Sequence, residues 1–249
     1  MREAHLYGPS YIAQRFDRRR ARMQDQERAR LRWHKMGGRI LDVGCGDGDF
    51  LAGLDDRWEK WGVDISPEAV KIASGKGIRM EPFTERWPEG FSDESFDAIV
   101  FRGTLQHLDL PFYVLRECVR LLNPGGTLAF LATPNAGSLC YKLFGTLPAL
   151  DPPRNWWVFS DRELLNVLAR LGMRVEQVVY PYWRTPYARP LRDLLDFGLR
   201  LIGIRRGFAF PGNMMEVFAR KPGPNNSRAF VAEFASSAEL GAWLHAETA

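Results

Sequence analysis

The sequence has few cysteines and no long apolar run. Among 249 residues, only Cys45, Cys118 and Cys140 are cysteines, and they lie far apart. This excludes a disulfide framework, a paired-cysteine metal site and iron–sulfur radical chemistry, and it favours a reducing compartment. The sequence contains no stretch of about 18 apolar residues, so it predicts no membrane span. The first ten residues, MREAHLYGPS, lack the apolar core of a signal peptide, so we expect a cytoplasmic protein.

Positive charge is in slight excess and gathers near the start of the chain. The formal net charge is +4, and residues 15–35 hold nine Arg and Lys residues, diluted by few acids such as Glu27. Such a run usually forms the solvated face of a helix, and binding of an anionic partner is the alternative. We interpret residues 1–36 as a helical N-terminal extension with few apolar anchors, among them Met23, Leu31 and Trp33.

From residue 37 onward, strand and helix patterns alternate. Short and mostly unbroken apolar runs are typical of strands covered on both faces. They predict strands over residues 39–43, 61–64, 78–80, 96–101, 127–133, 174–180 and 214–220. Helix starts are indicated by Ser66 before Pro67 and by the Ser160–Glu163 capping box. The NPGG stretch at 123–126 predicts a turn before the fifth strand. This order is typical of an α/β fold with a doubly wound sheet.

Two irregular inserts interrupt the later part of the chain, at about residues 134–158 and 181–213. They are rich in Pro, Arg and aromatic residues, and inserts on an α/β core usually cover or line a substrate site. Residues 194–208 of the second insert combine apolar residues with Arg200, Arg205 and Arg206, which suits either a lid helix or a membrane surface. Residues 223–249 are expected to form a flexible tail with a short helix near 233–245.

The stretch RILDVGCGDGDFL, residues 39–51, is the strongest sign of a ligand site. A glycine-rich turn after the first strand lets backbone approach a ligand, and the next helix directs N–H groups at it. Dinucleotide-binding loops read G-x-G-x-x-G, whereas Gly44, Gly46 and Gly48 alternate here. Acids such as Asp42 would repel a pyrophosphate, and the G-K-[ST] of a P-loop is missing. The loop therefore favours a cationic or neutral ligand.

These motifs resemble those of the class I S-adenosylmethionine-dependent methyltransferases. ILDVGCGDG resembles the first motif, VDIS the end of the second strand, FDAIVFRGTLQHL the fourth strand and its loop, and LLNPGGTLAF the fifth strand. NMMEVFARKP resembles the last strand, which runs antiparallel in this family. The resemblance covers about residues 38–222 and is nearest to small-molecule methyltransferases such as the ubiquinone-pathway O-methyltransferases. It implies a seven-stranded Rossmann-like sheet in a cofactor-binding domain over residues 37–222, with the two inserts as lid segments.

The resemblance also implies the residues that hold S-adenosylmethionine. They are Asp42, Gly44, Cys45, Gly46, Gly48, Asp64, Ile65 and Phe83. Asp42 would meet the ammonium group, Asp64 the ribose hydroxyls, and Ile65 the adenine ring. Relatives commonly carry an acid for the adenine amino group after the third strand. Here Pro82 and Phe83 occupy those positions, so Phe83 is expected to supply backbone contacts and an aromatic wall instead.

Methyl transfer from a sulfonium is an in-line displacement that needs no metal and no nucleophilic residue. It needs an acceptor placed in a dry pocket, and a hydroxyl acceptor gains from a general base. His107 follows the fourth strand at the carboxyl edge of the sheet and is the candidate base, with packing of the next helix as the alternative. The candidate substrate contacts are Arg102, Asn135, Asn155 and Trp156.

We therefore expect methyl transfer to a small or medium-sized metabolite, at oxygen, without a nucleic-acid partner. An RNA methyltransferase is the alternative suggested by the basic run. A non-catalytic cofactor-binding protein is a second alternative, because Gln106 stands where relatives have Glu before His107, and Asn155 stands where the subgroup usually has His. Peripheral contact with a membrane stays open, and the sequence predicts neither the acceptor nor the oligomeric state.

Overall fold

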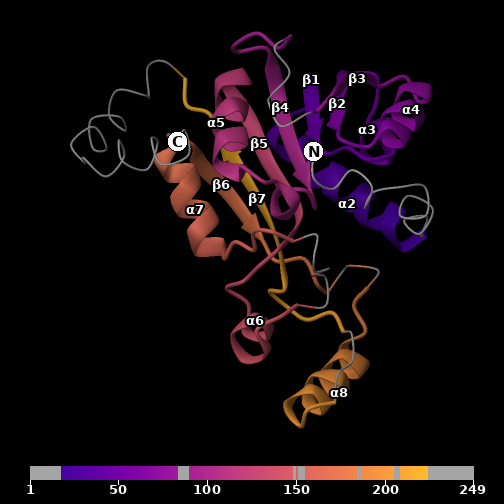
Figure 1. Cartoon of the computed structure of the whole chain (residues 1–249), viewed down its shortest axis with the longest axis vertical. Helices are drawn as coiled ribbons and strands as arrows, with labels where there is room; N and C mark the ends of the chain where they lie inside the picture. Colours follow the sequence, from indigo (N-terminus) through magenta and orange to yellow (C-terminus); the bar gives the residue numbers. More distant parts are fainter. Residues whose placement is uncertain are drawn as a thin grey trace.

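A seven-stranded sheet forms the centre of the molecule (Figure 1). The computed structural model describes residues 18–83, 90–147, 150, 155–183, 185, 187–204 and 208–223. The strands are β1 (Gly38–Val43), β2 (Trp58–Asp64), β3 (Arg79–Pro82), β4 (Phe96–Arg102), β5 (Leu122–Pro134), β6 (Arg174–Val179) and β7 (Met214–Arg220). Their order is β3-β2-β1-β4-β5-β7-β6. The first five run parallel, and β7 is antiparallel to β5 and β6. The predicted α/β fold with its antiparallel last strand is confirmed.

Helices cover both faces of this sheet. One face packs against α2 (Arg18–His34), α3 (Asp49–Ala52) and α4 (Pro67–Gly75), and the other against α5 (Pro111–Leu121) and α7 (Asp161–Arg170). Alternate residues of each strand point to opposite faces. In β4, Ala98 and Val100 join the α2–α4 side of the core, whereas Ile99 and Phe101 join the α5–α7 side. This explains why the strands read as unbroken apolar runs.

The helix starts predicted at Ser66 and Ser160 are found in the structure. The Ser66 hydroxyl caps α4 by accepting a hydrogen bond from the N–H of Ala69 at 3.3 Å, with Pro67 at the first position. Ser160 and Glu163 form the complete capping box of α7. These contacts join residues no more than three positions apart, which is why the sequence alone reveals them.

Two expectations about the chain differ from the structure. The NPGG stretch lies inside β5, because Gly125 donates to the carbonyl of Lys221 at 2.8 Å and Lys221 donates back to Gly126 at 2.9 Å. The pairing register with β4 shifts at this point, so the predicted turn is a bulge held by the chain after β7. Trp33 is 79% exposed, unlike an apolar anchor, whereas Met23 and Leu31 are buried as expected.

The two inserts supply a lobe at the end of the molecule where β5 stops. It contains α6 (Leu139–Phe144) and α8 (Pro190–Leu201), the latter farthest from the sheet (Figure 1). The lobe has its own small core of Cys140, Leu147 and Phe208. Within the described residues, no helix combines the length and the apolar character that crossing a membrane would require. Residues 1–17, Arg205, Arg206 and the predicted tail helix lie outside them.

Candidate functional site

The sheet changes its direction of winding between β1 and β4. The chain leaves β1 toward α3 on one face and leaves β4 toward α5 on the other. Ligands of open α/β sheets bind at such a point, beyond the carboxyl ends of the strands. Asp42 lies next to the end of β1, and Arg102 is the last residue of β4. The fold thus brings the candidate residues of two separate motifs to one edge.

The glycine loop after β1 is shaped by close packing against the protein itself. Gly44, Gly46 and Gly48 all have positive φ, between 57° and 76°, where other residues are strained. A Cβ on Gly44 would lie 2.3 Å from Thr104 Cγ2, and one on Gly48 would lie 2.3 Å from Ile78 Cδ1. Two of the glycines therefore let the loop approach neighbouring segments. The following helix, α3, has only four residues, so the expected helix dipole adds little here.

Asp64 anchors the glycine loop from the end of β2. Its Oδ2 accepts the N–H of Gly46 at 2.8 Å, and its Oδ1 accepts the N–H of Ser66 at 2.9 Å. The side chain is half-buried, and the N–H of Phe83 donates to the Asp64 carbonyl at 3.3 Å. Ile65, next in the chain, keeps part of its surface exposed. Asp64, Ile65 and Phe83 therefore lie together beside the loop.

Asp42 is a buried acid with an open hydrogen-bonding position. Only 1% of its surface is exposed, and its Oδ1 has no hydrogen-bond partner within the described part of the chain. Burial raises the pKa of Asp42 to about 7, against the opposing effect of Arg102. By contrast, the Cys45 thiol packs 3.7 Å from the sulfur of Met80, and burial raises its pKa well above the usual value. Only the backbone of Cys45 belongs to the loop surface.

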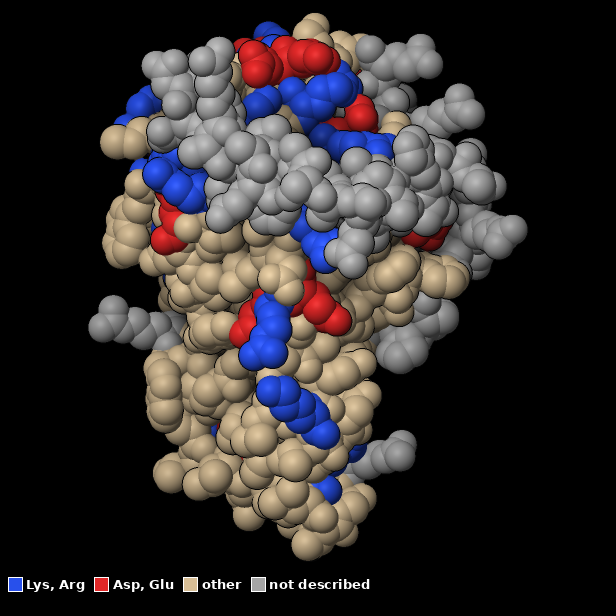
Figure 2. Space-filling view, turned by 90° about the vertical axis from the view of Figure 1, so that its left-hand side faces the viewer, with Lys and Arg blue, Asp and Glu red and all other residues tan. Residues whose placement is uncertain are grey.

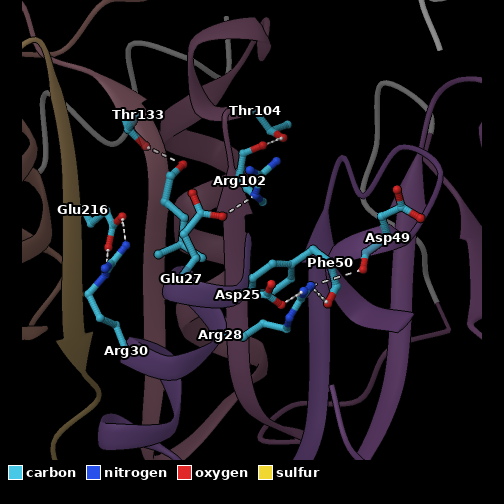
Figure 3. A network of polar contacts seen from close by, with 11 residues as sticks. Asp25, Glu27, Arg28, Arg30, Asp49, Phe50, Arg102, Thr104, Thr133 and Glu216 are labelled. Atoms are coloured by element: carbon cyan, nitrogen blue, oxygen red, sulfur yellow. Dashed lines mark hydrogen bonds and ion pairs between the residues drawn. The ribbon is translucent and has the colours of Figure 1, made fainter. Parts of the chain in front are cut away.

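Helix α2 closes one side of this region with buried ion pairs. Arg102 donates through Nε to Glu27 Oε2 at 2.5 Å, and both side chains are almost fully buried (Figure 3). Arg28 of the same helix donates to the carbonyl oxygens of Asp49 at 3.3 Å and Phe50 at 3.1 Å, just after the glycine loop. The basic run is therefore only partly a solvated face, because some of its charges hold α2 on the sheet.

In the sequence, Glu27 is expected only to dilute the charge of the basic run, whereas the structure buries it completely. A signal was present, because Met23 and Leu31 lie four residues before and after it and place it on their buried helix face. The contact between Thr104 and Gly44 joins residues 60 positions apart, so no signal in the sequence marks Thr104.

The charge of this region suits a cationic ligand. Asp42, Asp64 and Glu27 interact electrostatically there, and the Arg102 guanidinium opposes them. One oxygen each of Asp42 and Glu27 is buried without a partner among the residues that the structure describes. A buried carboxylate gains most from a nearby positive charge. The sulfonium and ammonium groups of S-adenosylmethionine fit this requirement, and a pyrophosphate does not.

The loop after β4 carries a second group of candidate residues. His107 ends the 3-10 helix η2 (Leu105–His107), and its Nε2 lies 3.3 Å from Nε2 of Gln106. The backbone carbonyl of Gln106 accepts the N–H groups of Trp156 at 2.8 Å and Trp157 at 3.2 Å. Asn155 directly precedes this contact. The structure therefore brings His107, Asn155 and Trp156 together, as an acceptor site would require, with Trp156 more than half exposed.

Asn135 holds the backbone together at the end of β5. It is buried, and its Oδ1 accepts the N–H groups of Gly137 at 2.8 Å and Asp161 at 3.0 Å. Its Nδ2 donates to the carbonyl of Gly212 at 3.0 Å. These bonds join the end of β5 to the start of α7 and to the loop before β7. They give the Asn135 amide a structural role.

Comparison with known proteins gives the same assignment as the geometry. The family model for a methyltransferase domain matches residues 13–178. A ubiquinone biosynthesis O-methyltransferase of Xanthomonas oryzae is 34% identical over 116 residues, which are 43% of this chain and 47% of that protein. The chain thus matches just under half the length of this relative. The protein of the same name from Xanthomonas axonopodis is 32% identical over 167 residues, covering 59% of this chain and 69% of that protein.

A solved structure shares the fold. The S-adenosylmethionine-dependent methyltransferase of Thermotoga maritima, described as a possible histamine N-methyltransferase, has a TM-score of 0.56 and 21% identity. The match covers 81% of this chain and 88% of that one. The family match, the sheet order and the acidic glycine loop agree, and the chain belongs to the methyltransferase-domain family of class I proteins that use S-adenosylmethionine as cofactor.

Proposed function

We propose that the protein transfers the methyl group of S-adenosylmethionine to an oxygen atom of a small or medium-sized metabolite in the cytoplasm. The observation that carries the cofactor part is the buried oxygen of Asp42, which has no hydrogen-bond partner among the described residues and lies beside the loop that Asp64 anchors. The oxygen acceptor is supported by the relatives, which are named as O-methyltransferases. Three free and buried cysteines fit a reducing compartment.

On the cofactor side, we assign roles from position and charge. Bound S-adenosylmethionine supplies an electrophilic methyl group on a positively charged sulfur. Asp42 offers its buried carboxylate oxygen to the ammonium group, the Arg102 guanidinium acts electrostatically on Asp42, and Glu27 holds Arg102. Asp64, whose carboxylate faces the glycine loop, is assigned to the ribose hydroxyls. The backbone of Gly44, Cys45, Gly46 and Gly48 lines the methionine part, and Ile65 and Phe83 flank the adenine.

On the acceptor side, His107 is the proposed general base, and Asn155 and Trp156 are proposed to contact the acceptor. Their support is that the 155–157 segment binds the Gln106 carbonyl, next to the imidazole. A histidine near neutral pH can take the proton of an acceptor hydroxyl as the carbon–oxygen bond forms. The half-exposed Trp156 offers an apolar surface that excludes water from the acceptor.

Calorimetric titration with S-adenosylhomocysteine tests the cofactor site. Asp64→Ala removes charged hydrogen bonds worth about 1.5–3 kcal/mol, so we expect binding to weaken by roughly 10- to 100-fold. Asp55→Ala is the matched control, because Asp55 is an acid before the start of β2, paired with Arg57, and its loss should leave the affinity unchanged. Equal affinity of the wild type and Asp64→Ala would contradict the assignment, provided that both melt at the same temperature.

Turnover is measured separately, as S-adenosylhomocysteine released with fractions of cell extract. His107→Ala should lower this rate and leave cofactor affinity intact, since His107 is proposed to act on the acceptor. Cofactor binding without turnover in any fraction would favour a non-catalytic cofactor-binding protein.

A further inference from the structure

Helix α8 presents its apolar side to the outside of the molecule. Leu191, Leu194, Leu195 and Leu201 of the helix, with Ile202 and Ile204 after it, are between 44% and 88% exposed. Its acids, Asp193 and Asp196, are buried instead. This is the reverse of the usual surface helix, which turns its apolar stripe toward the core. An exposed apolar stripe of this length marks an interaction surface.

Contacts within the lobe fix this orientation. Asp193 Oδ2 accepts the Tyr182 hydroxyl at 2.9 Å and the N–H of Arg189 at 2.7 Å. Burial and this carboxylate raise the pKa of Tyr182 to about 12, so its hydroxyl stays a donor. On the same inner side, Phe197 stacks on Phe210 with ring centroids 4.7 Å apart. The acids and the aromatic ring hold the inner side, and the leucines are left outside.

Helix α6 extends the same surface. Leu139 and Leu143 are each about half exposed, and the Arg200 guanidinium lies 5.5 Å from the ring centroid of Phe144, which joins the two helices. We call the exposed residues of 139–143 and 189–204 the α6–α8 face. In Figure 2 the lower part of the molecule is mostly uncharged surface crossed by separate basic side chains, whereas acidic residues gather higher up.

The charges of the α6–α8 face have one sign. In the described stretches 139–147 and 187–204, the exposed charged residues are Lys142, Arg189 and Arg192, and Arg200 is half exposed. Both acids of these stretches are buried, and Asp196 pairs with Arg192 at 3.5 Å. A second copy of the chain docked face to face by two-fold symmetry would bring these cations against each other, which disfavours it as the occupant. A surface that combines apolar groups with negative charge would suit both the exposed apolar residues and the cations of this face.

We propose that the α6–α8 face docks on the surface of an anionic lipid bilayer. The leucines and isoleucines enter the boundary between headgroups and acyl chains, and Lys142 and Arg189 meet lipid phosphates. The lobe follows the end of β5, so docking places the bilayer on the side where the carboxyl edge lies (Figure 1). The proposal stands independently of methyl transfer, because it rests on surface residues alone.

Co-sedimentation of the full chain with vesicles tests this docking. We expect binding to vesicles of phosphatidylglycerol mixed with phosphatidylcholine, and weaker binding to pure phosphatidylcholine. Leu194→Gln/Leu195→Gln should lower the partition coefficient by at least about tenfold, since each leucine contributes apolar burial. Lys142→Gln/Arg189→Gln should lower binding to the anionic vesicles by roughly tenfold and change binding to the neutral ones little.

Ile72→Gln/Leu110→Gln is the matched control, because both residues are exposed aliphatic residues outside the lobe, and it should bind as the wild type does. All substituted residues are exposed, so melting temperatures should stay unchanged. Absence of vesicle binding by the wild type, or equal binding by the leucine variant, would overturn the proposal. The proposal would also be overturned if the protein did not bind vesicles but formed a concentration-dependent dimer that the leucine variant disrupts. That result would assign the α6–α8 face to contact with a second copy of the chain.

Discussion

Asp42 lies at the carboxyl end of β1 with 1% of its surface exposed, and burial raises its pKa to about 7. Its ordinary pKa is 3.8, so the folded protein binds a proton at this site over a pH range in which the unfolded chain does not. The free energy of unfolding therefore falls as the pH rises from about 4 to about 7, and stays low above that. A cation bound beside Asp42 would offset this cost.

The substitution Asp42→Asn separates this effect from other buried acids. Asn resembles the protonated acid, so at about pH 4, close to the pKa of the unfolded Asp, the two proteins should have similar free energies of unfolding. At about pH 8 the cofactor-free variant should be more stable, by up to ~4 kcal/mol for a pKa rise of this size. Urea denaturation at both pH values measures the difference. The pKa of Glu216 is also raised to about 7 by burial, but Glu216 is present in both proteins, so its effect cancels in the difference between their free energies of unfolding. A difference that does not change with pH would contradict the burial of an ionised Asp42.

At the scale of elements, helix α2 shows which contacts cannot be predicted from the sequence. Its basic run is plain in the sequence, but the partners of Arg30 and Glu27 are Glu216 and Arg102, which lie 186 and 75 positions away. Glu216 lies within β7, and in the sequence it resembles an acid on the solvent face of a strand. In the structure α2 covers it, and it is buried (Figure 3). Local chemistry such as the Ser160 capping box is visible in the sequence, whereas pairing between distant segments is not.

The same distinction applies to the candidate site. The position of Asp42 and Asp64 at one edge of the sheet could be predicted, because both acids stand at the ends of strands in the sequence. The structural tasks of Gly44 and Asn135 could not, since they depend on Thr104 and on the loop before β7. These tasks arise from tertiary packing, and residues that pack together in the fold have no fixed spacing along the chain.

The ion pair between α2 and β7 gives a prediction for this element. Arg30→Met leaves the Glu216 carboxylate buried without its guanidinium, so at about pH 8 the free energy of unfolding should fall by roughly 3 kcal/mol. At about pH 5 the loss should be smaller, because Glu216, with a folded pKa near 7, is then protonated. Urea denaturation checks both values. Arg32→Met is the control, because Arg32 lies in the same helix and interacts electrostatically with Asp55, which is not buried; it should cost less than about 1 kcal/mol at either pH. Equal losses for the two variants would show that α2 is not held by this pair.

At the scale of the whole molecule, the net charge of +4 is distributed unevenly. Cations of α2 turn inward to acids and carbonyl groups, acids gather around the glycine loop, and the α6–α8 face carries exposed cations only. RNA binding depends on exposed cations that release counterions from phosphates. The inward pairing of Arg28 and Arg30 removes them from such a role, and leaves the exposed Arg19 and Arg22 of this helix as the residues to test.

Deleting residues 1–36 would be a poor test of RNA binding, because it strips the buried Leu31 and the Arg30–Glu216 pair from the sheet. Arg19→Gln/Arg22→Gln keeps the fold and removes two exposed charges. Fluorescence anisotropy with a short single-stranded RNA should give only non-specific binding, with Kd of roughly 1–100 µM at physiological salt, and a weak effect of the double variant. The charge-neutral Gln26→Asn is the control for changing this helix. A sub-micromolar Kd that survives raised salt and is lost in the arginine variant would instead favour an RNA acceptor. The expected result leaves the acid-lined edge of the sheet, rather than the basic helix, as the place where this protein recognises its ligand.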